Sequence, residues 1–273
     1  MNSGIVIRGF IQHVLPILLF AHSFAVVQAQ TLSLSEEEIA WIAERVYRNE
    51  CFSQDECLIE WNMGEEFLSL GIGHFIWYPK GHKGPFEESF VKYLGYARDC
   101  GEKIPRWLNV SPFPACPWNS REEFLASQQD SRLLQLREFL LATKSRQADF
   151  LIKRLEDALP LILSGLTVDS AREISEKFHL LASCSSGIYA LVDYINFKGL
   201  GILESERYQG QGWGLLQVLS LMDEQVNPQA AVHDFVRAAK IVLRRRVANA
   251  LPQRNEQRWL AGWLVRLESY LQE

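Results

Sequence analysis

The chain has 273 residues, a formal net charge of −5 and a hydrophobic fraction of 48%. This composition is typical of a globular protein and excludes an intrinsically disordered one. The acidic balance gives no basis for binding nucleic acid, because a polyanion is attracted to a basic surface.

The first 29 residues have the layout of a cleavable secretory signal. Arg8 precedes an apolar stretch over residues 14–27, and the segment ends at Ala29, where a signal peptidase would cut. A membrane anchor is the alternative, but a proline and a histidine interrupt the stretch, which is shorter than a span of about 20 residues. We therefore expect residues 30–273 to form a soluble periplasmic or secreted domain that is not inserted in a membrane.

The first predicted element of that domain is a helix over residues 36–50. Ser35 and Glu38 have the spacing of a capping box, and apolar residues follow at helical intervals through Tyr47. Residues 67–79 then combine aromatic and β-branched side chains with two glycines. This pattern predicts a short β-hairpin or a pair of strands.

From residue 86 onward the pattern is almost entirely helical. Ser120 and Glu123 form a second capping-box pattern, and a glycine-rich polar segment covers residues 199–214. Helical stripes cover residues 133–141, 150–159, 174–182, 190–197, 215–219, 233–247 and 259–270. The predicted fold class is mainly α (α+β), in a single domain with one small β-hairpin near the start of the mature chain.

Five cysteines can oxidise after export. Cys51 with Cys57, and Cys100 with Cys116, would each close a short loop and leave Cys184 unpaired, although other pairings are open. There is no Cys-x-x-Cys pair and no histidine at ligand spacing. We therefore expect neither a metal site nor a cofactor.

Glu50 ends the first predicted helix, and the run Ser69-Leu-Gly-Ile-Gly-His74 follows about twenty residues later. Over residues 36–80 this arrangement resembles the lysozyme superfamily, which includes phage-type and goose-type lysozymes and chitosanases. There, a catalytic Glu ends a helix, and a hairpin leads to Thr or Ser, one residue and then Gly-Ile-Gly-His or a close variant. The resemblance implies a lysozyme-like fold with two lobes around a cleft, with Glu50 as the general acid and Ser69 in a supporting catalytic role.

The sequence departs from this family at the second carboxylate. Counting back from Ser69 by the phage-lysozyme spacing leads to Met63, and the chitosanase spacing leads to Gly64. Glu65 is one position further on, and alternation in a strand would place it on the same face as Ser69. We therefore assign Glu65 as the base that activates water. The alternative is that no second protein carboxylate acts, as in goose-type enzymes.

The chemistry of glycoside cleavage fits a carboxyl group at the position of Glu50. The general acid must hold a proton near neutral pH, and apolar neighbours that desolvate the group would raise its pKa. The alternative is a structural carboxylate at a helix end, paired with Arg45 or Arg48 against the helix dipole.

Polar and aromatic residues elsewhere are candidates for contacting a sugar. Amide side chains can bond hydroxyl and acetamido groups, and aromatic rings can stack on sugar faces. The candidates are His74, Trp77, Tyr78, Asn196, Lys198, Gln209, Trp213 and Gln217. The alternative is that the glycines of 199–214 make turns, that Trp213 fills the core and that His74 is a buried structural residue.

The expected function is an exported glycoside hydrolase acting on an amino-sugar polysaccharide, most of all peptidoglycan. The polysaccharide is the expected partner. The alternatives are an enzyme that degrades chitosan or an exopolysaccharide, a lytic transglycosylase, which needs a single acid/base, and a non-catalytic lysozyme-like glycan-binding protein.

Overall fold

The computed structural model describes residues 32–51 and 54–272, and the predicted signal segment lies outside them. Helices dominate, and two small antiparallel sheets accompany them, so the predicted mainly helical fold with a small β element is confirmed. The α-helices of the described residues are α1 Glu36–Cys51, α2 Ser89–Asp99, α3 Arg121–Ala126, α4 Ser131–Ala142, α5 Lys144–Leu163, α6 Val168–Leu181, α7 Ser185–Lys198, α8 Leu215–Leu221, α9 Pro228–Asn249 and α10 Gln257–Glu268.

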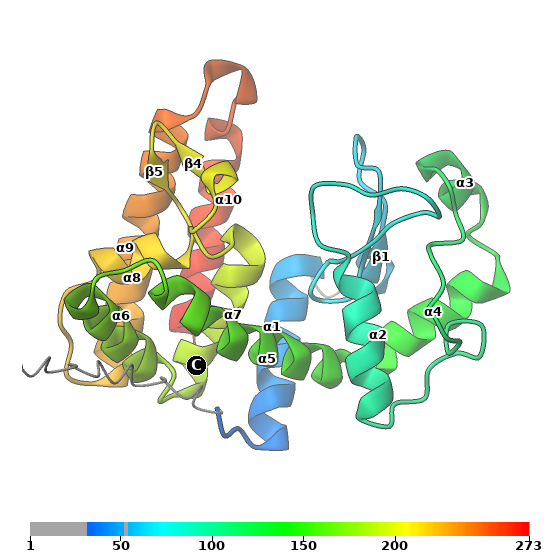
Figure 1. Cartoon of the computed structure of the whole chain (residues 1–273), viewed down its shortest axis with the longest axis horizontal. Helices are drawn as coiled ribbons and strands as arrows, with labels where there is room; N and C mark the ends of the chain where they lie inside the picture. The colour runs from blue at the N-terminus through cyan, green and yellow to red at the C-terminus, as the bar shows by residue number, and fades with distance from the viewer. Residues whose placement is uncertain (1–31, 52–53, 273) are drawn as a thin grey trace, which may run out of the picture.

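Helix α1 begins at the predicted capping box. The Ser35 hydroxyl accepts a bond from the Glu38 amide at 3.2 Å, and the Ser35 amide donates to the Glu38 carboxylate at 2.9 Å. The helix then buries Ile42, Val46 and Tyr47 and packs against α5 and α7. These three helices lie in the middle of the molecule, with a group of other elements on either side (Figure 1).

One group is built on a three-stranded antiparallel sheet of β1 Ile59–Glu60, β2 Leu68–Leu70 and β3 Phe75–Trp77. The predicted hairpin is therefore confirmed as β2 and β3, with Ser69 opposite Ile76. Aromatic rings pack the hairpin onto the helices beside it, since Phe75 stacks on Tyr93 of α2 with centroids 5.1 Å apart. This packing fixes the hairpin relative to the end of α1.

The other group contains α6, α8, α9 and α10 together with the two-stranded sheet of β4 Arg207–Tyr208 and β5 Gln211–Gly212. Helix α9 contacts α6, α7, α8 and α10 and holds this group together. The glycine-rich segment before α8 contains β4 and β5, which lie in the upper part of the group in Figure 1, below the connection between α9 and α10.

The second capping box is only half formed. The Ser120 hydroxyl accepts a bond from the Glu123 amide at 3.2 Å, as predicted. The Glu123 carboxylate, however, accepts from the amide of Asn119 at 2.8 Å and not from that of Ser120. The chain before the helix turns so that the amide one residue earlier is the donor within reach.

The two predicted disulfides have different outcomes. Cys51 and Cys57 are bonded, with Cα atoms 5.2 Å apart, so that pairing is confirmed. Cys100 and Cys116 are free thiols, so the second pairing is wrong. Cys100 lies at the exposed end of α2, whereas Cys116 is buried and bonded through its amide to the carbonyl of Tyr78. Within the described ranges, no helix is long and apolar enough to cross a membrane.

Candidate active site

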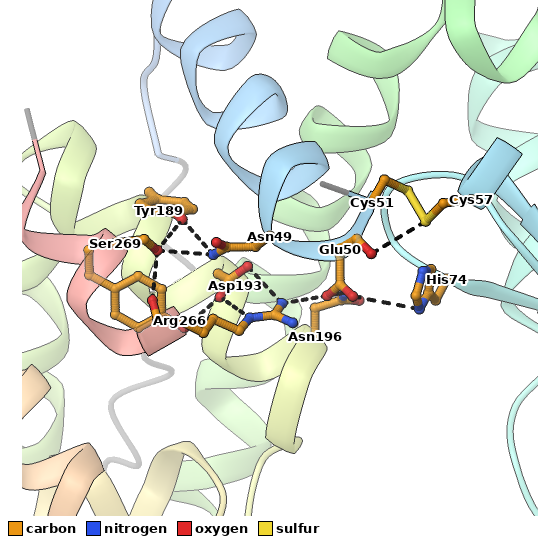
Figure 2. A network of polar contacts seen from close by, with 11 residues as sticks. Asn49, Glu50, Cys51, Cys57, His74, Tyr189, Asp193, Asn196, Arg266 and Ser269 are labelled. Carbon is orange, nitrogen blue, oxygen red and sulfur yellow. Dashed lines mark hydrogen bonds and ion pairs between the residues drawn. A yellow bond between two sulfur atoms is a disulfide. The ribbon is translucent and has the colours of Figure 1, made fainter. Parts of the chain in front are cut away.

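The carboxylate of Glu50 lies at the end of α1 where the two groups of elements meet. Its side chain is only 9% exposed. Asn196 of α7 and Arg266 of α10 contact it from one side, and His74, at the end of the β2–β3 turn, approaches it from the other (Figure 2). Four segments that are far apart in the sequence therefore converge on one carboxylate.

The two oxygens of this carboxylate have different surroundings. Oε1 accepts hydrogen bonds from Asn196 Nδ2 at 3.0 Å and from Arg266 Nη2. Oε2 lies 3.6 Å from His74 Nδ1, which is beyond hydrogen-bond distance, and it accepts no hydrogen bond from a described residue. Oε1 is therefore fixed by the protein, and Oε2 is the oxygen left to bond another group.

Arg266 joins Glu50 to a second, fully buried carboxylate. Its guanidinium donates two bonds to Asp193, from Nε and Nη2, each 2.8 Å long. Tyr270 also donates to Asp193, at 2.5 Å. Paired guanidinium–carboxylate bonds fix both the position and the plane of the arginine. Asp193 thus fixes the orientation of Arg266, and Arg266 in turn holds the Glu50 carboxylate.

The electrostatics of Glu50 differ from those predicted. Burial by itself raises the pKa of Glu50, but the positive charge of Arg266 and the proximity of His74 lower it, and the hydrogen bonds from Arg266 and Asn196 add to this. The net result is a pKa of Glu50 below its ordinary value, so the predicted rise is wrong. The arginine at its side overrides the effect of desolvation.

The turn that carries His74 is held by a buried residue of α5. Gln147 is fully buried; its Oε1 accepts from the Ile72 amide at 2.8 Å, and its Nε2 donates to the Leu140 carbonyl at 2.7 Å. Gly71 has φ +67°, and a Cβ at that position would lie 2.1 Å from Gln147 Oε1. The first glycine of the run therefore leaves room for the side chain of Gln147.

His74 itself has an unusual backbone for a residue with a side chain. Its φ is +45°, in the left-handed region that residues other than glycine seldom adopt. Its side chain is 32% exposed and its Nδ1 faces Glu50, whereas Nε2 is buried without a hydrogen-bond partner among the described residues, so the residue is half-buried. Strained residues of this kind concentrate at functional sites, which makes His74 part of the candidate site.

Ser69 and Glu65 do not occupy comparable positions. Ser69 is in the central strand β2 and is 4% exposed. Glu65 precedes that strand, so the premise that both residues share a strand face is wrong. Its carboxylate accepts a bond from Asn62 at 3.0 Å and lines a surface cavity of about 380 Å³. Glu65 is not among the described residues that contact the Glu50 carboxylate.

Two of the predicted sugar-stacking rings near the hairpin are in the core. Trp77 is fully buried and donates to the carbonyl of Pro114 at 3.0 Å. Tyr78 is buried as well, and its hydroxyl donates to the carbonyl of Phe86. The prediction that these two rings contact a sugar is wrong, because the segment between α2 and α3 packs over Trp77 and the loop after β3 covers Tyr78.

The predicted contacts of the glycine-rich segment are mostly structural. Trp213 is buried, which agrees with its alternative as a core residue. Gln217 accepts from the Gly214 amide at 2.9 Å and donates to the Gly201 carbonyl at 3.0 Å, so both functions of its amide are used within the loop. Gln209 is exposed at the turn between β4 and β5 and reaches the carbonyl of Asn249 at 3.4 Å. None of these residues contacts the Glu50 carboxylate among the described groups.

Asn196 and Lys198 are the predicted residues of this half that lie near Glu50. Asn196 bonds the carboxylate, and Lys198 lies on the same end of α7.

Sequence reasoning missed Arg266 entirely, because a single arginine on an amphipathic helix has no distinctive pattern. The available signal was the spacing of Trp259, Trp263 and Arg266, which places three large side chains along one side of a helix.

The disulfide borders the site. Cys57 Sγ lies 3.3 Å from the Glu50 carbonyl oxygen, and because it is disulfide-bonded it has no hydrogen to donate. Cys51, Cys57 and His74 are the one cluster of potential metal ligands in the described ranges. Thiolates, not disulfide sulfurs, bind metal ions, so this cluster does not fit a metal while the bond is present.

No family model, curated protein or solved structure matches this chain. The resemblance of residues 36–80 to the lysozyme superfamily therefore stays a prediction.

Proposed function

We propose that this protein is an exported glycosidase that cleaves an amino-sugar polysaccharide, most of all peptidoglycan, with Glu50 as the acid/base residue. The observation that carries the proposal is the asymmetry of the Glu50 carboxylate. Oε1 is held by Arg266 and Asn196, and Oε2 is left without a hydrogen bond among the described residues. Proton transfer to a glycosidic oxygen needs one positioned carboxyl oxygen within hydrogen-bond reach, and Oε2 is such an oxygen.

The lowered pKa of Glu50 restricts how this chemistry can proceed. In the ligand-free protein at neutral pH the group is a carboxylate, because Arg266 favours the charged form. A sugar that excludes water from Oε2 would oppose Arg266 and favour protonation, since desolvation raises the pKa of a carboxyl group. For acid catalysis we therefore expect kcat/KM to rise as the pH falls toward the pKa of Glu50 in the free protein.

The disulfide beside Glu50 supports an exported location. Disulfides persist in oxidising compartments such as the periplasm or the extracellular medium, and Cys51–Cys57 directly follows the proposed catalytic residue. Peptidoglycan and exported polysaccharides are the glycans present there.

A lytic transglycosylase is a second candidate, and the position of Glu65 favours it. Inverting hydrolysis uses a second carboxylate roughly 6.5–9.5 Å from the acid to activate water. Glu65 instead bonds Asn62 and lines a surface cavity whose lining residues do not include Glu50. If a hydroxyl of the sugar itself attacks, a single acid/base is sufficient, and Glu50 alone could serve.

The decisive experiment compares the mature protein with Glu50→Gln on peptidoglycan, chitosan and chitin oligomers, with the products read by mass spectrometry. We expect the variant to lose about 10²- to 10⁴-fold in turnover, the usual contribution of a general acid. A product lighter by one water would identify the transglycosylase. Glu44→Gln is the matched control, because Glu44 is on the exposed side of the same helix, where it pairs with Lys144.

Two results would contradict the proposal. Equal turnover by the wild type and Glu50→Gln would remove Glu50 from the mechanism. Glycan binding without cleavage by either protein would favour a non-catalytic binding protein. Glu65→Gln decides between the two enzyme classes, since loss of turnover would assign Glu65 as the base and retention would exclude it.

A further inference from the structure

Helix α10 carries a row of large side chains that begins at Glu50. Arg266 contacts Glu50, and Trp263 and Trp259 lie one and two turns before it on the same side of the helix. The two indole rings are 6.2 Å apart with 31° between their planes. Trp259, at the far end of the row, is 43% exposed. The row therefore leads from the candidate acid/base to an exposed aromatic ring.

Lys198 at the end of α7 faces this row. Its Nζ lies 3.5 Å from the ring centroid of Trp263 and 3.7 Å from that of Phe197. The residue is 8% exposed, and no carboxylate or other hydrogen-bond acceptor among the described residues contacts its ammonium group. Burial of an unpaired ammonium is unfavourable, and cation–π contacts offset only part of that cost.

The other charges around Lys198 are already paired. Arg246 of α9 donates two bonds, of 2.8 and 3.0 Å, to Glu256. Arg266 is shared by Glu50 and Asp193. Lys198 is therefore the basic side chain of this cluster that has no acidic partner among the described residues, and its environment would accept one negative group.

We propose that Phe197, Lys198, Trp259 and Trp263 form an acidic-sugar subsite, which binds a carboxylate-bearing sugar of the polysaccharide that Glu50 cleaves. The carboxylate pairs with the ammonium group of Lys198, and the sugar ring packs on the exposed indole of Trp259. This inference rests on the proposed function, because it assigns the position of one substrate residue relative to Glu50.

The electrostatics around Lys198 support a ligand of this charge. Burial, together with the charges of Arg246 and Arg266, lowers the pKa of Lys198 to about 6, although Glu256 and Glu50 oppose this shift. At pH 7 the free protein therefore holds Lys198 largely as the neutral amine. A bound carboxylate favours the charged form, so binding takes up a proton, and affinity rises as the pH falls from 8 to 6.

The test is isothermal titration of the mature wild-type protein with three glycans of equal length. Oligogalacturonate carries a carboxylate on every ring, peptide-free peptidoglycan strands carry lactyl carboxylates, and chitin oligomers are neutral. We expect at least one acidic glycan to bind ten or more times more tightly than chitin. Whichever of oligogalacturonate and the peptidoglycan strands binds more tightly identifies the kind of sugar that carries the carboxylate. Buffers of different ionisation enthalpy at pH 7 should reveal proton uptake.

Lys198→Met keeps the apolar stem and should abolish both the preference for acidic glycans and the proton uptake. Lys153→Met, on the exposed side of α5, is the matched control and should change neither. His74 also faces Glu50, but it is not part of the proposed subsite. His74→Gln should therefore leave the proton uptake in place.

Equal affinity of the wild type for acidic and neutral glycans, or binding without proton uptake, would overturn the subsite. The wild-type measurements decide this even if Lys198→Met does not fold. An inactive protein that still prefers acidic glycans would contradict the proposed function alone. An active enzyme without that preference would contradict the subsite alone.

Discussion

Two regions of the chain meet at Glu50, and their sequences differ in how directly they specify the site. Residues 36–80 contain a cap, a helical stripe and a glycine-rich turn, and α1 and the hairpin formed where these patterns predicted them. Residues 193–217 are as rich in polar and aromatic side chains. There, however, Trp213 is buried and Gln217 ties the loop together.

The difference has a physical origin. A long loop must satisfy the hydrogen bonds of its buried backbone, and side-chain amides such as Gln217 supply partners for them. A dense run of polar residues in a loop therefore does not distinguish ligand contacts from structural ties. The residue of the C-terminal half that most affects Glu50 is Arg266, which lies 216 positions away. The predictions below test whether the site depends on Arg266 and the N-terminal region while Gln217 only ties its own loop together.

The largest effect is expected for Arg266→Met. The substitution leaves Asp193, which is fully buried, and Glu50 without their shared counter-ion. Removing one partner of a buried ion pair typically lowers the free energy of unfolding by about 3–5 kcal/mol. Urea titration of the variant and the wild type measures this loss. Arg258→Met, on the exposed part of the same helix, should cost under about 0.5 kcal/mol. Similar stabilities of the two variants would mean that the site does not depend on Arg266.

The next effect concerns the disulfide of the N-terminal region. Cys51 and Cys57 are six positions apart, and a loop of that size corresponds to about 2 kcal/mol of stabilisation from reduced entropy of the unfolded chain. The double variant Cys51→Ala/Cys57→Ala should lose about this amount in urea unfolding. Cys100→Ser, at an exposed free thiol, should be neutral. An unchanged midpoint of urea unfolding in the double variant would show that the disulfide does not stabilise the fold.

Gln217→Ala tests the structural interpretation of the glycine-rich segment. It removes bonds to the Gly214 amide and the Gly201 carbonyl, and each such bond contributes about 0.5–1.5 kcal/mol. We expect lower stability in urea unfolding and unchanged glycan affinity of the folded protein. Gln209→Ala, at the exposed turn, should retain full stability. Loss of glycan affinity without loss of stability would instead make Gln217 a ligand contact.

The smallest effect concerns the pH dependence of stability. Because the folded-state pKa of Glu50 is lowered by Arg266, its carboxylate stabilises the fold above the unfolded value of about 4.3. This stabilisation is lost as the pH falls through the folded-state pKa. The gap in unfolding free energy between wild type and Glu50→Gln should therefore narrow from pH 6 toward pH 3. A gap that is constant over this range would contradict the charged state assigned to Glu50.

The local parts of the fold were predictable because their causes are local. Ser35 caps α1 through a residue three positions away, and Cys51 pairs with Cys57 across a short loop. The exclusion of Cys100 from a disulfide was not predictable, because it depends on how α2 and the segment containing Cys116 are placed. Likewise, the burial of Trp77 depends on the segment between α2 and α3, which packs against its ring and accepts its indole N–H at Pro114.

The sequence by itself determined that Glu50 ends a helix and that a glycine-containing turn follows it, since backbone preferences and capping act over a few residues. Only the tertiary structure decided the charge state and surroundings of that carboxylate. Arg266, Asp193 and Asn196 reach it through helix packing, and electrostatic effects follow distance in space, not separation along the chain. The same packing leaves Lys198 without a counter-ion among the described residues, which the order of residues could not reveal.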